Sequence, residues 1–242
     1  MALRTPRVYR YDRVDSTMDL LHQMADEGAP AGTAVVAGEQ LAGRGARGRF
    51  WHSPPGGLWL SILFRPRSAS ATEVMSLRVG LSVARTLDHF LSTPVGLKWP
   101  NDLMLGERKL GGILCEARWQ GPVLGWVAVG VGLNVRNQLP AELRRSAVSL
   151  VEHQPSLQVN DLLEPTVSSL RVLDLEVDRL SQGELDEFAA RSWLAGRQIR
   201  EPLCGTVAGL GDDGTLRVRT QDGAQVAVRS GSVELADLSH TP

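Results

Sequence analysis

Four apolar segments of strand length, separated by short turns, constrain the fold more than any other feature of this sequence. The turns lie at Gly106 and Gly121. Short apolar runs that are bounded by glycine are typical of strands. Strands joined by such short turns are most simply arranged as a hydrophobic antiparallel meander. The four segments are Gly96–Trp99, Leu103–Leu105, Gly111–Ala117 and Val123–Val135.

Helical patterns accompany the strands, so the predicted fold class is α/β (α+β). Apolar residues recur at helical spacing over Thr72–Leu91, which we expect to be the longest early helix. Asp15-Ser16-Thr17 offers N-cap residues before another helical pattern. Further helices are predicted at Val159–Leu180, with Pro165 in the first turn, and at Glu184–Trp193. The other early strands are predicted at Val8–Val14, Thr33–Glu39 and Leu58–Phe64.

The character of the sequence changes near Gly196. Turn signals at Gly211–Gly214 and Asp222-Gly223 separate short segments of strand type. These segments are Leu203–Ala208, Thr215–Arg219 and Gln225–Val228. We therefore predict a main domain over residues 1–195 and a small β-barrel domain over residues 196–242.

Composition limits the class of protein. Hydrophobic residues make up 43% of the 242 residues, which is enough for a core. The 26 Lys and Arg residues nearly balance the 27 Asp and Glu residues, which disfavours a strongly basic nucleic-acid binder. The two cysteines form no C-x-x-C pair, and their small number fits a reducing compartment. With no signal-peptide pattern and no apolar run long enough for a bilayer, we expect a cytoplasmic protein without membrane contact.

A glycine- and arginine-rich stretch, Gln40–Arg49, is the first candidate for chemistry. Glycine lets the backbone approach a ligand closely, and arginine presents planar forks to phosphate or carboxylate oxygens. The stretch suits a mobile loop that closes over a polyanion. Taken alone, it is equally a solvated flexible loop, and it lacks both the Walker A order and the interleaved aromatics of an RNA-binding segment.

Two further motifs carry lysine and glycine. Lys98-Trp99-Pro100-Asn101-Asp102 places polar groups after a proline, and Lys109-Leu110-Gly111-Gly112-Ile113-Leu114 places a lysine at a strand end. Lys109 would serve as a point charge for a phosphate. Asp102 would hold a magnesium ion or a ribose hydroxyl. Taken alone, the first motif is an ordinary turn and Lys109 an ordinary surface lysine.

The segment Gly130-Val131-Gly132-Leu133-Asn134 has glycine at alternate positions. Such a strand has one face without side chains, which permits close approach of a ligand or of another backbone. Tight packing or a bulge would explain it equally well. It is not a dinucleotide fingerprint, because the third glycine and the following helix are missing.

The order of these motifs resembles the biotin protein ligase family. The preceding Asp15-Ser16-Thr17 and the segment Trp51–Leu58 also match the family pattern. The motifs span Val8–Val135, and the C-terminal β segments extend the resemblance to Leu235. Each motif is weak alone, but the combination is highly specific.

The resemblance implies both a fold and a reaction. The fold is a mixed α/β catalytic domain related to class II aminoacyl-tRNA synthetases, followed by an SH3-like β-barrel. The carboxylate of biotin attacks the α-phosphate of ATP and gives biotinyl-5′-AMP and pyrophosphate. A lysine of a biotin carboxyl carrier protein domain then takes the biotinyl group and releases AMP.

The resemblance assigns the biotin contacts to small polar residues, glycines and two cations. Ser16, Thr17 and Gln40 would face the ureido ring, which has one acceptor and two donors. Lys109 would stabilise charge at the α-phosphate and is the residue expected to matter most, with Arg44 as the second catalytic cation. The full biotin set is Ser16, Thr17, Gln40, Gly43, Arg44, Gly45, Lys109, Gly130 and Gly132.

The expected ATP contacts form a second set. Arg47 and Arg49 would add positive charge toward the triphosphate, and Trp51 would pack by the adenine. Asp102 would be the magnesium ligand. The ATP set is Arg47, Arg49, Trp51, Asn101, Asp102 and Asn134.

Two positions depart from the family pattern. The family loop commonly has arginine where this chain has Ala46, which bears on how tightly the loop retains the adenylate. Met18 stands where asparagine is frequent, which removes one hydrogen bond to the ring.

Other functions share some of these features. A lipoate or octanoate ligase or transferase has the same fold, but octanoyl transferases need no ATP, and the arginine-rich loop favours biotin. A catalytically silent biotin sensor is disfavoured because Lys109, Arg44 and Asp102 are retained. Many relatives carry an N-terminal DNA-binding domain, whereas the catalytic motifs here begin at Asp15, so we expect no specific DNA binding. A homodimer is an open expectation, since related ligases often pair through their sheets.

Overall fold

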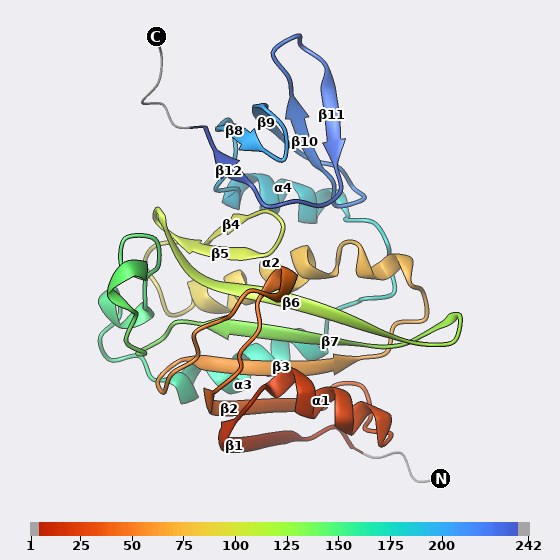
Figure 1. Ribbon diagram of the computed structural model, residues 1–242, viewed down its shortest axis with the longest axis vertical. Coiled ribbons are helices and arrows are strands. Elements are labelled where there is room, and N and C mark those ends of the chain that lie inside the picture. Colours follow the sequence, from red (N-terminus) through yellow and green to blue (C-terminus); the bar gives the residue numbers. More distant parts are fainter. Residues whose placement is uncertain (1–4, 237–242) are drawn as a thin grey trace.

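A seven-stranded mixed sheet runs through the larger part of the molecule in the computed structural model, which describes residues 5–236 (Figure 1). The strand order is β1-β2-β3-β7-β6-β5-β4. Only the β1–β2 pair is parallel among the described strands of this sheet. The bounds are β1 Val8–Val14, β2 Ala34–Gln40, β3 Leu58–Phe64, β4 Gly96–Lys98, β5 Asp102–Leu105, β6 Arg108–Gln120 and β7 Val123–Leu133.

The predicted antiparallel meander is confirmed, because β4 to β7 pair consecutively. Its turns lie where glycine was expected. Gly106 and Gly121 adopt φ of 59° and 61°, a left-handed conformation that glycine reaches without steric cost. The first four residues of the chain and the last six of the predicted C-terminal domain lie outside the described residues.

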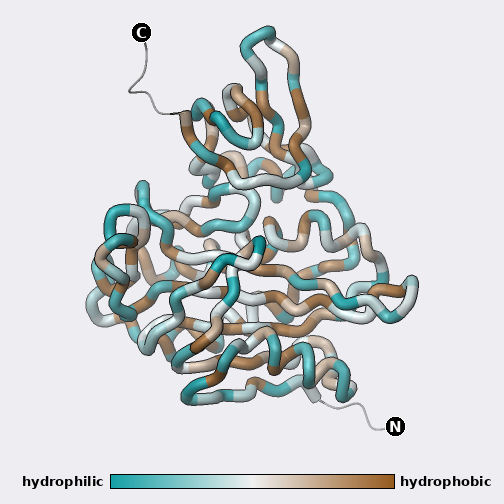
Figure 2. The backbone as a smooth tube through the Cα atoms, in the orientation of Figure 1, coloured by the Kyte–Doolittle hydropathy of each residue, from teal (hydrophilic) through white to brown (hydrophobic). Residues whose placement is uncertain are grey.

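Helices cover both faces of the large sheet. Helix α1 (Thr17–Asp26) lies on one face, and α2 (Met75–Asp88) and α3 (Val159–Arg171) lie on the other (Figure 1). The two faces bury separate apolar clusters. Along β3 every residue is buried, as expected for a central strand covered on both sides. Hydrophobic colouring accordingly follows the strands of the large sheet, while the turns are hydrophilic (Figure 2).

A five-stranded antiparallel sheet follows α4 (Gln182–Arg191) and packs beside the β4 edge of the large sheet (Figure 1). Its order is β11-β10-β9-β8-β12. The small C-terminal β domain is thus confirmed, while its boundary at residue 196 stays a prediction. The bounds are β8 Gln198–Glu201, β9 Gly205–Leu210, β10 Leu216–Arg219, β11 Gln225–Val228 and β12 Glu234–Leu235.

The C-terminal domain is fixed to the large sheet by polar contacts. The indole nitrogen of Trp99 donates to the carbonyl of Gly214 at 2.9 Å. Arg197 forms an ion pair with Glu107, with 2.6 Å between nitrogen and oxygen. These contacts hold the domain close to the β4–β5 hairpin.

The predicted helix Val159–Leu180 is too long, because α3 ends at Arg171. Buried Arg78 on α2 holds the segment that follows the helix. Its guanidinium donates to the carbonyls of Val177 and Arg179, which lie beyond the end of α3. Tertiary contacts therefore override the local helical pattern in this segment.

Three smaller predictions also need correction. Pro165 lies inside α3 rather than in its first turn, at an exposed position where solvent can reach the carbonyl that loses its donor. The long early helix is shorter than Thr72–Leu91, since α2 spans Met75–Asp88. Strands β8 and β12 were not predicted.

Across residues 5–236, none of the helices combines the length and the apolar character needed to cross a bilayer.

We expect Arg78→Met to lower the free energy of unfolding by about 3 kcal/mol, because it removes the charged partner of the Glu184 carboxylate and the side-chain donor to two carbonyls. Urea denaturation followed by circular dichroism measures this. Arg85→Met on the same helix is the matched control, since the side chain of Arg85 is 49% exposed in its ion pair with Glu187. That variant should lose less than about 1 kcal/mol. Equal losses would contradict the anchoring role of Arg78.

Candidate active site

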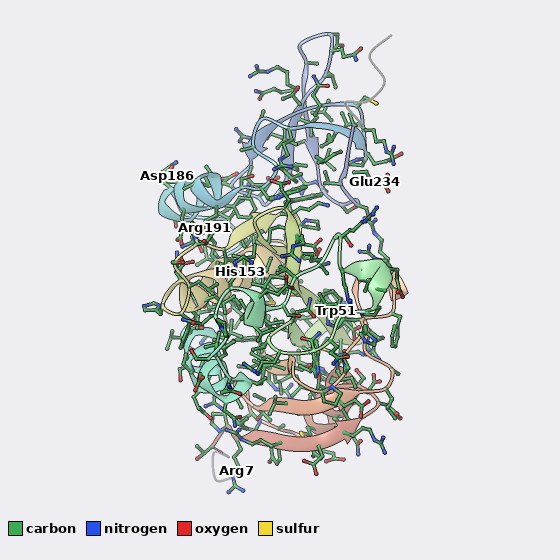
Figure 3. The ribbon with its side chains drawn as sticks, turned by 90° about the vertical axis from the view of Figure 1, so that its left-hand side faces the viewer. Arg7, Trp51, His153, Asp186, Arg191 and Glu234 are labelled. Carbon is green, nitrogen blue, oxygen red and sulfur yellow. The ribbon has the colours of Figure 1, made fainter. Side chains whose placement is uncertain are left out.

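A cavity of about 640 Å³ lies on the α1 face of the large sheet, beneath the loop that joins β2 to β3. The loop crosses in front of the sheet in Figure 1. Trp51, near its end, lies on the side of the sheet away from α3 (Figure 3). Most of the expected site residues line this cavity: Thr17, Gln40, Arg44, Gly45, Arg49, Trp51, Asn101, Asp102, Lys109, Gly130, Gly132 and Asn134. Ser16, Gly43 and Arg47 do not.

The cavity follows one row of residues across the sheet. Trp59 on β3 pairs with Gly132 on β7, which pairs with Gly112 on β6. Gly112 pairs with Asp102 on β5, and Asp102 pairs with Lys98 on β4. Directly opposed residues of antiparallel strands point to the same face. Four strand spacings of about 4.8 Å make this row roughly 19 Å long.

The glycines of β7 allow other side chains to lie against the strand. A Cβ on Gly132 would come within 2.6 Å of the indole nitrogen of Trp51. A Cβ on Gly130 would lie 3.1 Å from the sulfur of Met18. Met18 lines the cavity, and its side chain therefore closes part of the floor. The expected side-chain-free floor is present, although Trp51 and Met18 cover part of it.

Hydroxyl and amide groups gather at the β2–β3 end of the cavity. The side-chain oxygen Oε1 of Gln40 accepts from both the backbone N–H and the hydroxyl of Thr17, each at 2.9 Å. The Thr17 hydroxyl lies 2.7 Å from that of Ser61, and the Gln40 amide donates to Ser53 at 2.9 Å. Buried Ser16 precedes α1, and its hydroxyl has no partner in the described structure. A buried hydroxyl without a partner needs an explanation, and a bound ligand would provide one.

Lys109 and Asp102 form an ion pair in the middle of the row. The ammonium nitrogen lies 2.5 Å from the carboxylate and 5.0 Å from the centre of the Trp51 ring. Backbone bonds with Ser146 and Val148 hold the start of β6 in place. Lys109 is therefore a partly buried cation that is already paired, rather than the free charge that the sequence suggested.

Lys98 lines the far end of the cavity, and the sequence analysis gave it no role. Its ammonium lies 5.3 Å from the centre of the Trp193 ring, and no ion pair of Lys98 occurs among residues 5–236. Burial lowers the pKa of Lys98, the nearby Asp102 opposes this, and the charges of Lys109 and Arg49 add to it. The cross-strand pairing of Lys98 with Asp102 is the signal that would have identified it.

The two asparagines of the ATP set have structural partners. Asn101 donates its amide N–H to the carbonyl of Ile113 at 2.7 Å, which ties the turn to β6. Asn134 is buried, and its side-chain oxygen accepts from Asn137 at 3.0 Å. Both reach the cavity wall, but neither presents a wholly free amide.

The arginines of the loop point in different directions. Arg44 lines the cavity and is held by Asp19 and Glu116. Arg47 donates to the hydroxyl of Ser232 in the C-terminal domain at 2.6 Å. Arg49 lines the cavity and donates to the carbonyl of Ala46.

Gly43 shapes the neck of the loop rather than the cavity. A Cβ there would meet the hydroxyl of Ser53 and the carbonyl of Trp51 at 2.5 Å. Any side chain at this position would force the two sides of the loop apart.

The carboxylates that line the cavity are Asp102, Glu107 and Glu142, and Asp102 is the one that lies in the row beside Lys109. No group of three or more His, Cys, Asp or Glu side chains within residues 5–236 is placed to hold a metal ion. A magnesium ion bound through one carboxylate and substrate phosphates fits such a site.

We expect Gly132→Ala to move the Trp51 indole off β7 and to lower stability by about 2 kcal/mol through overpacking. Acrylamide quenching of tryptophan fluorescence should increase, and the increase should vanish in a Trp51→Phe background. Gly130→Ala is the matched control, because it meets only the flexible end of Met18. Identical quenching in the two alanine variants would refute the packing described here.

Comparison with known proteins agrees with this architecture. The chain matches the model of the "Biotin/lipoate A/B protein ligase family" over residues 11–134. It is 30% identical to the "Bifunctional ligase/repressor BirA" of Bacillus spizizenii, with 93% of this chain and 72% of that protein covered. It is also 30% identical to the "Biotin--[acetyl-CoA-carboxylase] ligase" of Paracoccus denitrificans, with 88% and 95% covered. Matches to the BirA proteins of Bacillus subtilis and Escherichia coli cover 45% and 50% of those proteins.

Solved structures show the same fold. A biotin protein ligase from Aquifex aeolicus in complex with biotin and ATP aligns with a TM-score of 0.80 at 26% identity. The alignment covers 95% of this chain and 99% of that chain. The chain therefore belongs to the biotin/lipoate A/B protein ligase family.

Proposed function

We propose that this protein is a biotin protein ligase. It activates biotin with ATP to biotinyl-5′-AMP and transfers the biotinyl group to a lysine of a biotin carboxyl carrier protein domain. The relatives named biotin ligases and the solved complex with biotin and ATP support this assignment.

One observation carries the choice of substrates. A single cavity places hydroxyl and amide groups at its β2–β3 end, glycines in its middle and lysines at its β4–β6 end. Biotin has a urea ring, an apolar tail and a carboxylate in the same order. The row of paired residues from β3 to β4 is long enough to hold biotin joined to a nucleotide phosphate. Thr17, Gln40 and Ser61, which line that end, offer hydroxyl and amide groups to the ring.

The first step joins the carboxylate to the nucleotide. A carboxylate oxygen attacks the α-phosphorus of ATP, the bond from that phosphorus to the bridging oxygen breaks, and pyrophosphate leaves. Lys109 stabilises the charge that develops there, because its side chain lines the cavity and its ammonium lies 3.6 Å from where a Cβ on Gly112 would stand. Arg44 and Arg49 supply further positive charge from the loop.

The second step transfers the acyl group. The amine of the carrier lysine attacks the acyl carbon, the bond between that carbon and the phosphate oxygen breaks, and AMP leaves with the bonding electrons. No covalent bond to the enzyme is needed, so positioning and electrostatics do most of the catalysis. The Gly/Arg loop shields the adenylate from water until the carrier arrives.

Magnesium would accompany the nucleotide. Asp102 would hold it together with the phosphates, and the ion would supply charge neutralisation. Asp102 would then have to share its carboxylate between the ion and Lys109.

Two alternatives remain distinguishable. A lipoate or octanoate ligase needs no hydrogen-bonding groups at the β2–β3 end, so the cluster of Thr17, Gln40 and Ser61 favours biotin. A catalytically silent sensor needs no paired cations beside the carboxylate of biotin.

The proposal also includes a cytoplasmic location, because ATP and carrier domains meet there. The homodimer and the absence of specific DNA binding stay predictions.

We expect biotin-dependent release of pyrophosphate from ATP labelled at the γ-phosphate, rising to steady turnover when a carrier domain is added. Lipoate and octanoate serve as parallel substrates. Lys109→Ala should lower the rate about a hundredfold or more. Arg108→Ala is the matched control, since the neighbouring Arg108 pairs with Glu152 outside the cavity. Release with lipoate but not with biotin would overturn the substrate assignment, and unchanged turnover in Lys109→Ala would refute its role.

We expect Lys98→Met to weaken binding of pyrophosphate about tenfold, through the loss of a charged hydrogen-bond donor. Biotin binding should not change, because Lys98 lies at the opposite end of the row. The sequence contains only two lysines, Lys98 and Lys109, so an amine reagent and mass spectrometry can follow each one. Pyrophosphate should protect Lys98 from labelling. Full labelling of Lys98 at saturating pyrophosphate would contradict this placement.

A further inference from the structure

The tip of the loop over the cavity, residues 43–50, has few ties to the rest of the molecule, whereas the base of the loop is held by backbone bonds from Leu41 and Ala42 to the end of β1 and the residue after it. The backbone bonds of the tip are internal to the loop. Within residues 5–236, two side chains of the tip, Arg44 and Arg47, hydrogen-bond to elements outside the loop. Arg44 is the side chain that ties the tip to the large sheet and α1, so what holds Arg44 determines where the tip lies over the cavity.

Glu116 on β6 is the less exposed of the two carboxylates that hold Arg44. Its oxygens accept from both Nε and Nη2 of Arg44 at 3.3 Å, which makes the contact bidentate. The bonds from Arg44 to Asp19 are shorter, at 2.7 and 2.8 Å. However, the side chain of Asp19 is 56% exposed, against 21% for Glu116. Exposed ion pairs contribute little to stability, so Glu116 is the stronger anchor.

A chain of hydrogen bonds that runs from Trp126 through His22 orients the Glu116 carboxylate. The indole N–H of Trp126 can only donate, and it donates to Nδ1 of His22 at 2.9 Å. His22 therefore carries its proton on Nε2, which donates to Glu116 at 3.0 Å. The hydrogen bond from His22, opposed by burial and assisted by Arg44, lowers the pKa of Glu116 to about 2. The carboxylate is thus ionised, and the hydrogen bond from His22 fixes its direction toward Arg44.

Glu116 does not line the cavity, whereas Arg44 does. We propose that Glu116 is a positioning residue, which holds the Gly/Arg loop over the active site through Arg44 and is itself oriented by His22 and Trp126. The catalytic consequence of this positioning rests on the proposed ligase function. In that reaction, Glu116 would lengthen the time for which the adenylate stays beneath the loop.

The primary experiment measures the loop itself and needs no activity. Trypsin cleaves after arginine, and the loop contains Arg44, Arg47 and Arg49. In Glu116→Gln, cleavage within the loop should rise about fivefold over the wild type, as expected for the loss of one charged hydrogen-bonding partner. Cleavage after Arg144 and Arg145, followed in the same mass spectra, is the internal reference and should not change.

Three further variants separate positioning from general stability. Asp19→Asn should change loop cleavage much less than Glu116→Gln, because Asp19 is exposed. His22→Leu removes the donor to Glu116 and should raise loop cleavage, while His22→Gln offers an amide donor and should restore protection. Equal increases at the loop and at Arg144 would mean general destabilisation and would overturn the proposal. Unchanged loop cleavage in both Glu116→Gln and His22→Leu would overturn it as well.

A second measurement links the loop to the chemistry. With biotin and ATP but no carrier, Glu116→Gln should release a larger fraction of the biotinyl-5′-AMP that it forms into solution than the wild type does. An increase in loop cleavage without a larger released fraction would refute the catalytic consequence while leaving the positioning intact. Failure of every variant and of the wild type to form adenylate would refute the proposed ligase function instead.

Discussion

The glycine face of β7 is the constraint on which the rest of the site depends. Gly130 and Gly132 leave the centre of the sheet without side chains on the α1 side, although the opposite side of β7 packs into the core. Trp51 and Met18 use the space that the missing side chains leave. A ligand on the same face lies against the backbone of the sheet. It meets hydroxyl and amide groups at the β2–β3 end of the cavity and lysines at the β4–β6 end. The strand order therefore fixes the order of chemical groups along the cavity.

Charge is distributed unevenly along this cavity. Arginine carries nearly all the positive charge of the chain, and both of its lysines line the site. Lys109 is paired with Asp102, whereas Lys98 lies against Trp193 and, among residues 5–236, forms no ion pair. A partly buried cation is stabilised when an anionic ligand binds beside it. This arrangement fits a triphosphate whose α-phosphate lies near Lys109 and whose far end lies near Lys98.

The sequence was sufficient for the strands of the large sheet and for most cavity residues, since periodicity and turn glycines depend on local chemistry. It was insufficient where contacts between residues far apart in the sequence determine the local structure. Arg78 holds the non-helical segment after α3 through contacts with residues about 100 positions away. The partners of Arg44 are also remote: Glu116 lies 72 residues from it. Lys98 was missed because its place in the site follows from pairing with Asp102 across a hairpin, not from its motif alone.

The central claim is that this cavity joins an acid to the α-phosphate of ATP before any carrier protein takes part. Exchange of labelled pyrophosphate into ATP tests this directly, because reversal of adenylate formation is the only route by which the label enters ATP. The account predicts exchange that requires biotin, proceeds without a carrier domain and saturates with biotin concentration. Exchange without biotin, or no exchange with biotin although the carrier becomes biotinylated, would contradict the account.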